Sequence, residues 1–454
     1  MKNITLLFFI FISINCFAQF SKTHYIPPIT AQNNLVGDHY LYISTPSTTS
    51  VNFRIIENGN GGAVITGTVS NTAPYVYRIG TGNTTQLFTP KTEIGTVQNK
   101  GYVIEAENLI YASVRVNSGL TFSGNYNHAG GLVSKGNSAL GKVFRLGAML
   151  NPLYDTSLLN FASILSTENN TAITISNIPD GTVLSNGIII SGPISITLNK
   201  NESYVLALEN YPTSTSNSSK MIGALVVANK PVVVNSGSFG GSNNTILTGT
   251  SPMGTGRDVG FDQIVPLEKT GKTYIFVKGN GTDELERVIL VSHSDNTEIF
   301  TNGNPIPVTT LTAGSYHVLN GNDFINGNLY VTTSENVFAY QCIGGTASPA
   351  NQNLFFVPPL NCSTPNIVDN IPLIQAIGAV TYNGGLNIVT EANASVLINN
   401  LPISASAVPI IGPTAPSFVR YTVNNLSGNI AVTSSKQVYV SYFGTNGAAT
   451  YGGY

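Results

Sequence analysis

Apolar and polar residues alternate along most of this chain, in short runs separated by turn residues. An apolar pair followed by a hydroxyl-bearing or polar residue occurs at 42–45, 164–167, 290–293 and 388–391. After a polar connection, a second alternating run follows each of them, at 51–53, 171–173, 297–299 and 395–397. Alternation with a period of two is typical of half-buried β-strands. Each pair of runs therefore predicts a β-hairpin.

The four predicted hairpins belong to a longer repeat. A polar turn and then a β-branched or aromatic run follows each of them, at 107–111, 229–233, 335–339 and 436–440. The interval from Ser44 to Asn108 is 64 residues, and the interval from Ser166 to Lys230 is also 64. The corresponding intervals in the other two copies are 44 and 47 residues. Matching intervals of this kind indicate internal duplication.

These patterns predict an all-β protein of four tandem β-sandwich-like units. The expected units are 20–140, 141–258, 259–352 and 353–454. No segment shows helical periodicity, and 45 Gly and 23 Pro residues punctuate the chain. About seven short strands per unit fit a β-sandwich. A β-propeller built from the same repeats is the alternative, because it needs a similar number of strands.

Residues 1–19 have the three-part layout of a secretory signal peptide. Lys2 supplies a positive charge, Ile4 to Ile14 are almost wholly apolar, and small and polar residues follow at 16–19. This apolar run is too short to span a bilayer as a helix, and no later run is long enough. Lipid modification at Cys16 is an alternative that Asn15, a residue too large for such a site, argues against. We therefore expect a secreted protein or one displayed on the outer cell surface.

Composition and cysteine count narrow the function further. Only 9% of residues are charged and the net charge is -2, so no basic field is present to hold nucleic acid. Two cysteines remain after removal of residues 1–19, and in an oxidising compartment Cys342 and Cys362 are expected to form a disulfide. The histidines are not at metal-ligand spacing. No metal or other cofactor is predicted.

The chain contains no recognisable set of catalytic residues. The stretch 236–241 lacks the first glycine of a nucleophile elbow. Acidic residues cluster once, at Asp283, Glu284 and Glu286, where a solvated turn is the simpler explanation than a glycosidase pair. Aromatic residues near the end, including Tyr439, Tyr442 and Phe443, fit either a ligand platform or the final strands of the last unit. We therefore predict a protein that is not an enzyme, with no catalytic residue assigned.

With these motifs the sequence resembles the IgGFc-binding protein N-terminal domain family. The resemblance rests on the Ser-x-x-x-Asn-Thr pattern at 166–171 and 292–297, on the 230–234 strand, and on the connector at 265–267 with 271–274. It implies an exported β-repeat protein of bacterial type with an extracellular binding or adhesive role. Similar bacterial chains often continue into a C-terminal sorting domain, which is not visible here.

Three functional hypotheses follow. The first is a non-catalytic adhesion or binding protein whose partner is an extracellular glycan or protein, bound by residues that the sequence leaves unknown. The second is a secreted carbohydrate-active enzyme that uses the carboxylates at 283–286. The third is a structural spacer for a C-terminal module.

Overall fold

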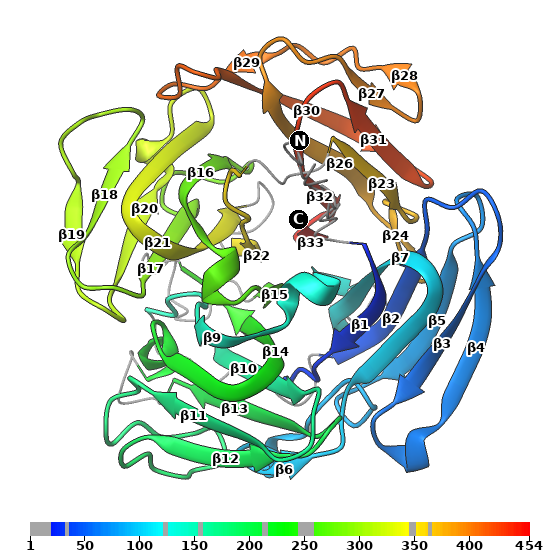
Figure 1. Cartoon of the computed structure of the whole chain (residues 1–454), viewed down its shortest axis with the longest axis vertical. Helices are drawn as coiled ribbons and strands as arrows, with labels where there is room; N and C mark the ends of the chain where they lie inside the picture. The colour runs from blue at the N-terminus through cyan, green and yellow to red at the C-terminus, as the bar shows by residue number, and fades with distance from the viewer. Residues whose placement is uncertain are drawn as a thin grey trace, which may run out of the picture.

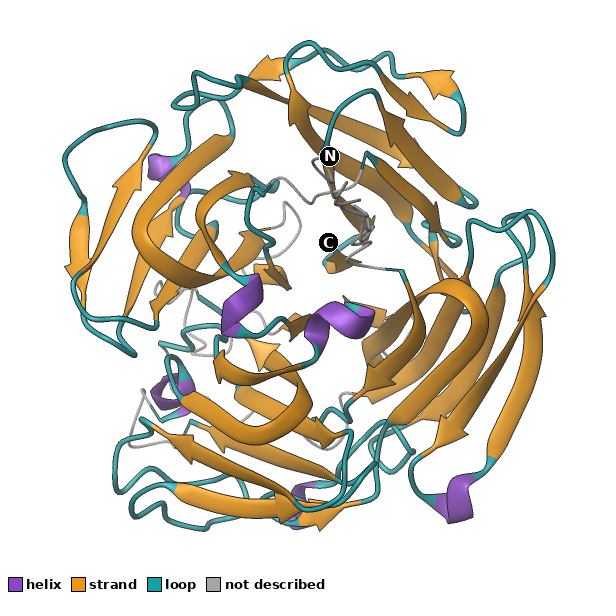
Figure 2. Cartoon of the chain, in the orientation of Figure 1, coloured by secondary structure: helices purple, strands orange, loops and turns teal. Residues whose placement is uncertain are grey.

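The computed structural model describes residues 20–31, 36–120, 126–152, 158–210, 217–243, 258–344, 351–361 and 366–454. Across these ranges the extended elements are β-strands, and the helical segments are 3₁₀ turns of three or four residues (Figure 2). The prediction of an all-β protein is confirmed.

The first unit shows how each unit is built. Its strands are β1 (Ser21–Ile26), β2 (Val36–Ser44), β3 (Val51–Glu57), β4 (Val64–Val69), β5 (Tyr75–Thr81), β7 (Tyr102–Leu120) and β8 (Tyr126–Val133). The first part of β7 pairs with β1 and β3, and its second part pairs with β2 and β8. Strand β4 extends the first half-sheet and β5 extends the second. One long strand thus belongs to two half-sheets that enclose an apolar core.

The second and third units repeat this topology. The second consists of β9 (Gly141–Arg145), β10 (Leu159–Ser166), β11 (Thr171–Ser176), β12 (Ile194–Leu198), β13 (Ser203–Glu209), β14 (Leu225–Gly241) and β15 (Asp258–Ile264), and β6 (Val97–Gln98) pairs with β13. The third consists of β16 (Gly271–Val277), β17 (Arg287–Ser292), β18 (Thr297–Thr301), β19 (Thr309–Leu311), β20 (Tyr316–Asn320), β21 (Asn328–Gly344) and β22 (Asn351–Phe356). Here β14 and β21 are the shared long strands.

The fourth unit keeps the topology but divides the long strand in two. Strand β31 (Ile430–Ser434) pairs with β23 (Ile367–Ile371) and β27 (Val396–Ile398), and β28 (Leu401–Pro402) extends that half-sheet. Strand β32 (Val438–Asn446) pairs with β26 (Asn383–Glu391) and β33 (Ala449–Gly453), and β30 (Phe418–Leu426) and β29 (Val408–Pro409) follow β26. A small hairpin of β24 (Ala376–Ile377) and β25 (Val380–Thr381) precedes β26.

The predicted hairpins are wrong in their pairing, although their strands exist. In the second unit, β10 pairs with β13 and β14, whereas β11 pairs with β12 and β14. The two strands therefore pair with different parts of one long strand instead of with each other. Alternation of apolar and polar residues indicates which face of a strand is buried, but it does not indicate which strand pairs with it. For the same reason the polar residues expected to form a turn at 229–231 lie inside β14.

The repeated sequence motif builds the crossing between half-sheets. The Ser166 hydroxyl donates to the Thr171 hydroxyl at 2.8 Å, and Ser292 does the same to Thr297 at 2.7 Å. Between them, Asn170 and Asn296 both have φ of 55°, a conformation that asparagine tolerates better than most residues. Residues 64 positions apart are also in contact in both units. The hydroxyl of Thr45 donates to the Leu109 carbonyl, and that of Thr167 donates to the Pro231 carbonyl.

The four units form a ring, and the last strand of each unit lies at its centre (Figure 1). These central strands are β8, β15, β22 and β33, and each packs against the next around the ring. Glycines allow the close approach. A Cβ at Gly130 of β8 would lie 2.4 Å from Val259 of β15, and one at Gly260 would lie 2.5 Å from the Leu354 nitrogen of β22. We propose that the second and third units end just after β15 and β22, respectively.

Candidate functional site

Apolar clusters fill three of the four seams between neighbouring units. Leu159 and Phe161 of β10 share a cluster with the core of the first unit, and Ile289 and Val291 of β17 share one with the second unit. Tyr42 of β2 and its neighbours share a cluster with the fourth unit. In each seam the packing comes from the second strand of a unit. Apolar burial of this kind contributes roughly 25 cal/mol per Å².

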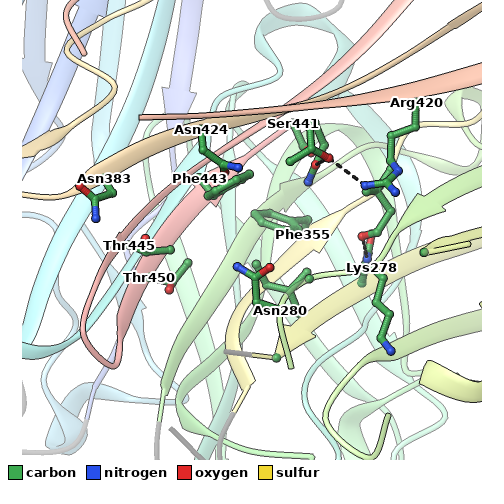
Figure 3. Close-up of a pocket in the computed structure, with 18 of the residues that line it drawn as sticks. Lys278, Asn280, Phe355, Asn383, Arg420, Asn424, Ser441, Phe443, Thr445 and Thr450 are labelled. Carbon is green, nitrogen blue, oxygen red and sulfur yellow. Dashed lines mark hydrogen bonds between the residues drawn. The ribbon is translucent and has the colours of Figure 1, made fainter. Parts of the chain in front are cut away.

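The seam between the third and fourth units is different. Its apolar cluster is small and includes Val277 of β16, Val389 of β26 and Tyr439 of β32. Beside this cluster lies a pocket of about 470 Å³ (Figure 3). The volume falls in the range of small-molecule binding sites, and junctions between domains are frequent places for such sites.

The floor of the pocket is one face of the fourth unit. Residues at alternate positions of a strand share a face, and Asn387 of β26 lies directly across from Thr422 of β30 and from Ser441 of β32. The pocket is lined on this side by Asn383, Asn387, Arg420, Thr422, Asn424, Asn425, Ser441, Phe443, Thr445 and Thr450. Asparagine amides and hydroxyl groups therefore stand where the second strands of the other units place apolar side chains.

The third unit supplies the opposite wall. Val277 ends β16, Lys278, Gly279 and Asn280 follow it along the pocket, and Phe355 comes from β22. Figure 3 shows Phe355 and Phe443 approaching from opposite walls. The lining thus combines two aromatic rings with many groups that both donate and accept hydrogen bonds.

Two cationic side chains line the pocket, and they have different partners. The Lys278 ammonium forms an ion pair with Asp283. The Arg420 guanidinium donates from Nη1 to the Thr422 hydroxyl at 2.8 Å and from Nη2 to the Asn326 carbonyl at 3.2 Å. Burial lowers the pKa of Arg420. Within the described ranges no carboxylate is placed in ion-pairing distance of Arg420.

The acidic cluster expected from the sequence does not face the pocket as a pair. Glu286 is buried, and its carboxylate accepts hydrogen bonds from the backbone amides of Gly279, Gly281 and Gly344 at 2.9–3.0 Å. Burial raises the pKa of Glu286, and these amides oppose the shift. Asp283 pairs with Lys278, and Glu284 is exposed. Glu286 therefore closes the 279–286 loop, and none of the described residues lining the pocket is a carboxylate.

The structure tests only one half of the predicted disulfide. Cys342 lies in β21 as a buried free thiol. Cys362 lies outside the described residues, so the bond between them stays a prediction. Burial raises the pKa of the Cys342 thiol to about 12.

The aromatic residues near the end of the chain lie partly in the core and partly in the pocket lining. Tyr439 and Tyr442 are buried, whereas Phe443 lines the pocket. His128 is paired with Asp258 at 2.8 Å between two central strands. Within the described ranges no group of three or more His, Cys, Asp and Glu side chains could hold a metal ion. The search of the same residues for a helix able to cross a membrane found none.

Sequence reasoning did not identify the pocket. Its residues come from two units that are adjacent only in the folded ring, so no local motif marks them. One usable signal exists, because Asn383 occupies the strand position where β10 carries Leu159, and Asn387 the position where β17 carries Ile289. Polar residues at a position that another copy keeps apolar indicate a surface used for another purpose.

Fold and site together define an all-β repeat protein with a polar pocket between two of its units. The model of the IgGFc binding protein family matches residues 130–444, which is more than half of the chain. The chain therefore belongs to this family.

Other comparisons add little. A search of curated proteins found no match. Among solved structures, an anti-sigma factor domain-containing protein is 7% identical, with 62% of this chain and 94% of that chain covered and a TM-score of 0.12. An anti-sigma factor domain-containing protein from Clostridium clariflavum is 10% identical, with 87% of this chain and 94% of that chain covered and a TM-score of 0.11. A GH78 family rhamnosidase of Bacillus sp. GL1 is 9% identical, with 76% and 54% covered and a TM-score of 0.13. Likenesses this weak carry no argument.

Proposed function

We propose that this protein is an exported, non-catalytic binding protein that holds a saccharide of an extracellular glycan in the pocket between its third and fourth units. The observation that carries the proposal is the lining itself. Amide and hydroxyl side chains, which donate and accept hydrogen bonds, occupy a seam whose three counterparts are packed with apolar residues. Keeping polar groups there forgoes burial that would stabilise the ring.

A saccharide matches this chemistry better than an apolar ligand does. Sugar rings carry hydroxyl groups around their edges, which suit Asn383, Asn424 and Thr445, and apolar C–H faces, which suit Phe443 and Phe355. The signal-peptide pattern at 1–19 supports export, although these residues lie outside the described part of the chain. Membership of a family named for binding supports the same conclusion.

The alternative of a carbohydrate-active enzyme has less support. A glycosidase needs two carboxyl groups roughly 5–10 Å apart across the scissile bond. The described residues lining the pocket include no Asp or Glu, and Glu286 is engaged by three backbone amides behind the wall. We therefore propose binding without hydrolysis.

A glycan and glycoprotein array probed with the mature chain tests the proposal. We expect binding to a restricted set of glycans, and loss of that binding in Asn383→Leu, because Asn383 is an exposed residue of the pocket lining and not part of the core. The matched control is Asn52→Leu, an exposed asparagine of β3 in the first unit. Silence of the wild-type chain on glycans, or equal loss in both variants, would contradict the proposal.

A further inference from the structure

Among the described residues, Arg420 is the cation of the pocket that has no carboxylate within ion-pairing distance. It projects from β30 into the seam, where it is half-buried and lines the pocket (Figure 3). A guanidinium removed from water is costly unless it is paired with an opposite charge. Within the described part of the chain its hydrogen bonds go to two neutral oxygens, those of Thr422 and Asn326.

Several other cations of the described residues have carboxylate partners. Lys278 in the same pocket pairs with Asp283, and in the first unit Arg54 pairs with Glu105 and Arg78 pairs with Asp38. Arginines without a carboxylate partner also occur, since Arg115 in the seam between the first and fourth units donates to three main-chain carbonyls. Arg420 differs because it lines a pocket, so that a ligand can reach its remaining donors. A ligand that carries a negative charge would supply what the protein does not.

The guanidinium is also held in place. Thr422, which accepts a hydrogen bond from Nη1 of Arg420, donates in turn to Oδ1 of Asn387 at 2.8 Å. Asn326, from the opposite unit, fixes Nη2. These two bonds engage two of the five N–H groups, so donors remain for a ligand. A pre-positioned planar fork is the group that best recognises a carboxylate through paired hydrogen bonds.

We propose that the ligand of this pocket is an acidic saccharide whose carboxylate binds Arg420. The inference rests on the proposed function, since it names the class of saccharide that the same site takes. The carboxylate lies against the guanidinium, the sugar ring lies between Phe443 and Phe355, and the asparagine amides bind the ring hydroxyls. A sulfated sugar would present the same charge with different geometry, and the test separates the two.

The test measures direct binding of the mature full-length chain by calorimetry. The probes are oligosaccharides that contain glucuronate, galacturonate or sialate, each compared with the same oligosaccharide after reduction of its carboxyl groups, and with a sulfated oligosaccharide of equal length. We expect at least one acidic probe to bind about tenfold or more tightly than its reduced partner and more tightly than the sulfated probe. Its affinity should fall as salt concentration rises.

Two variants assign that preference to Arg420. Arg420→Gln should remove the difference between the acidic and reduced probes, and Arg420→Lys should keep part of it because the charge remains. Arg54→Gln, in which an exposed arginine of β3 is replaced, is the control and should bind as the wild type does. The melting temperature of each variant, measured in parallel, shows whether the fold is retained.

The outcomes separate this inference from the proposed function. If reduced and acidic probes bind equally, or if the sulfated probe binds best, the acidic saccharide is excluded while saccharide binding stands. If a folded Arg420→Gln keeps the full preference, the carboxylate does not bind Arg420. If neither these probes nor the glycan array gives binding, both proposals fail.

Discussion

Lys135 and Asp262 form an ion pair that is buried where the four central strands of the ring meet. Nζ of Lys135 lies 3.1 Å from Oδ2 of Asp262 and donates to the Tyr454 main-chain oxygen at 2.9 Å. Asp262 also accepts hydrogen bonds from the amides of Val133 and Phe356. A carboxylate of β15 thus contacts β8 and β22, and its partner Lys135 contacts the residue after β33. Burial lowers the pKa of Lys135 and raises that of Asp262.

The first prediction concerns this pair. Asp262→Asn keeps the size of the side chain but leaves the Lys135 charge buried without its partner, which should reduce the free energy of unfolding by about 3–5 kcal/mol. Asp38→Asn breaks a more exposed ion pair with Arg78 and should change stability little. Urea denaturation followed by circular dichroism measures both. Equal effects of the two variants would mean that the central pair does not hold the ring together.

The second prediction concerns the seam between the first and last units. Arg115 of β7 is buried, and its guanidinium donates to the carbonyls of Pro372, Leu373 and Ala376 at 2.7–2.9 Å. It also lies over the ring of Tyr42, with 4.1 Å between the Cζ atom and the ring centroid. Arg115→Lys keeps the charge but loses the fork, and should cost about 2–4 kcal/mol.

Hydrogen exchange locates the effect of that substitution. Because the three carbonyls belong to residues 372–376, which lead into β24, we expect amides of 372–378 to exchange faster in Arg115→Lys, while amides of β14 keep their protection. Arg54→Lys is the matched control, since that arginine is exposed on β3. Uniform loss of protection around the whole ring would show that the first and fourth units do not open separately.

The sequence predicted the class of fold because alternation and turn residues are local signals. It also found the repeat, since Thr45 and Thr167 each bind a carbonyl 64 residues later and this geometry keeps the interval constant. It failed on pairing, because β2 and β3 meet at different parts of β7 and alternation contains no record of that. It did not predict the circular arrangement of the units, which depends on close contacts of Gly130 and Gly260 that no local pattern reveals.

The candidate site could not be predicted from the sequence because its residues are distant along the chain. Arg420 and Asn326 are 94 residues apart and meet only because the third and fourth units are neighbours in the ring. The acidic residues at 283–286 were candidates for a catalytic pair because they are close in sequence. In the structure the Glu286 carboxylate accepts hydrogen bonds from backbone amides, whereas Glu284 is exposed to solvent. Proximity in sequence was therefore a poor guide to proximity in space.

The third prediction concerns the cysteines. Because the Cys342 thiol is buried and its pKa is raised to about 12, the native protein should not react with iodoacetamide at pH 8 at this position. Intact mass after alkylation in denaturant, without reductant, then tests the predicted bond to Cys362. A disulfide leaves both residues unmodified until reductant is added. Full alkylation of both without reductant would show that the bond does not form.

The fourth prediction concerns acid stability. His24 and His39 are buried, and burial lowers the pKa of each from 6.5 to about 4. Between pH 6.5 and about 4 the unfolded chain therefore binds protons that the folded chain does not. Stability is unaffected by these residues above pH 6.5 and falls as the pH is lowered through this window. The loss below pH 4 is at most about 3 kcal/mol for each residue.

Glutamine substitutions isolate this contribution. Nε2 of His24 contacts the Ile110 carbonyl at 2.9 Å and Nε2 of His39 contacts the Thr85 hydroxyl at 2.7 Å, and a glutamine amide can supply a similar donor without titrating. We expect the difference between urea midpoints at pH 7.5 and pH 4.5 to shrink in His24→Gln/His39→Gln, whatever its stability at pH 7.5. His317→Gln, at a half-buried ring, should shrink it less. A double variant as sensitive to acid as the wild type would mean that other groups cause the acid loss of stability.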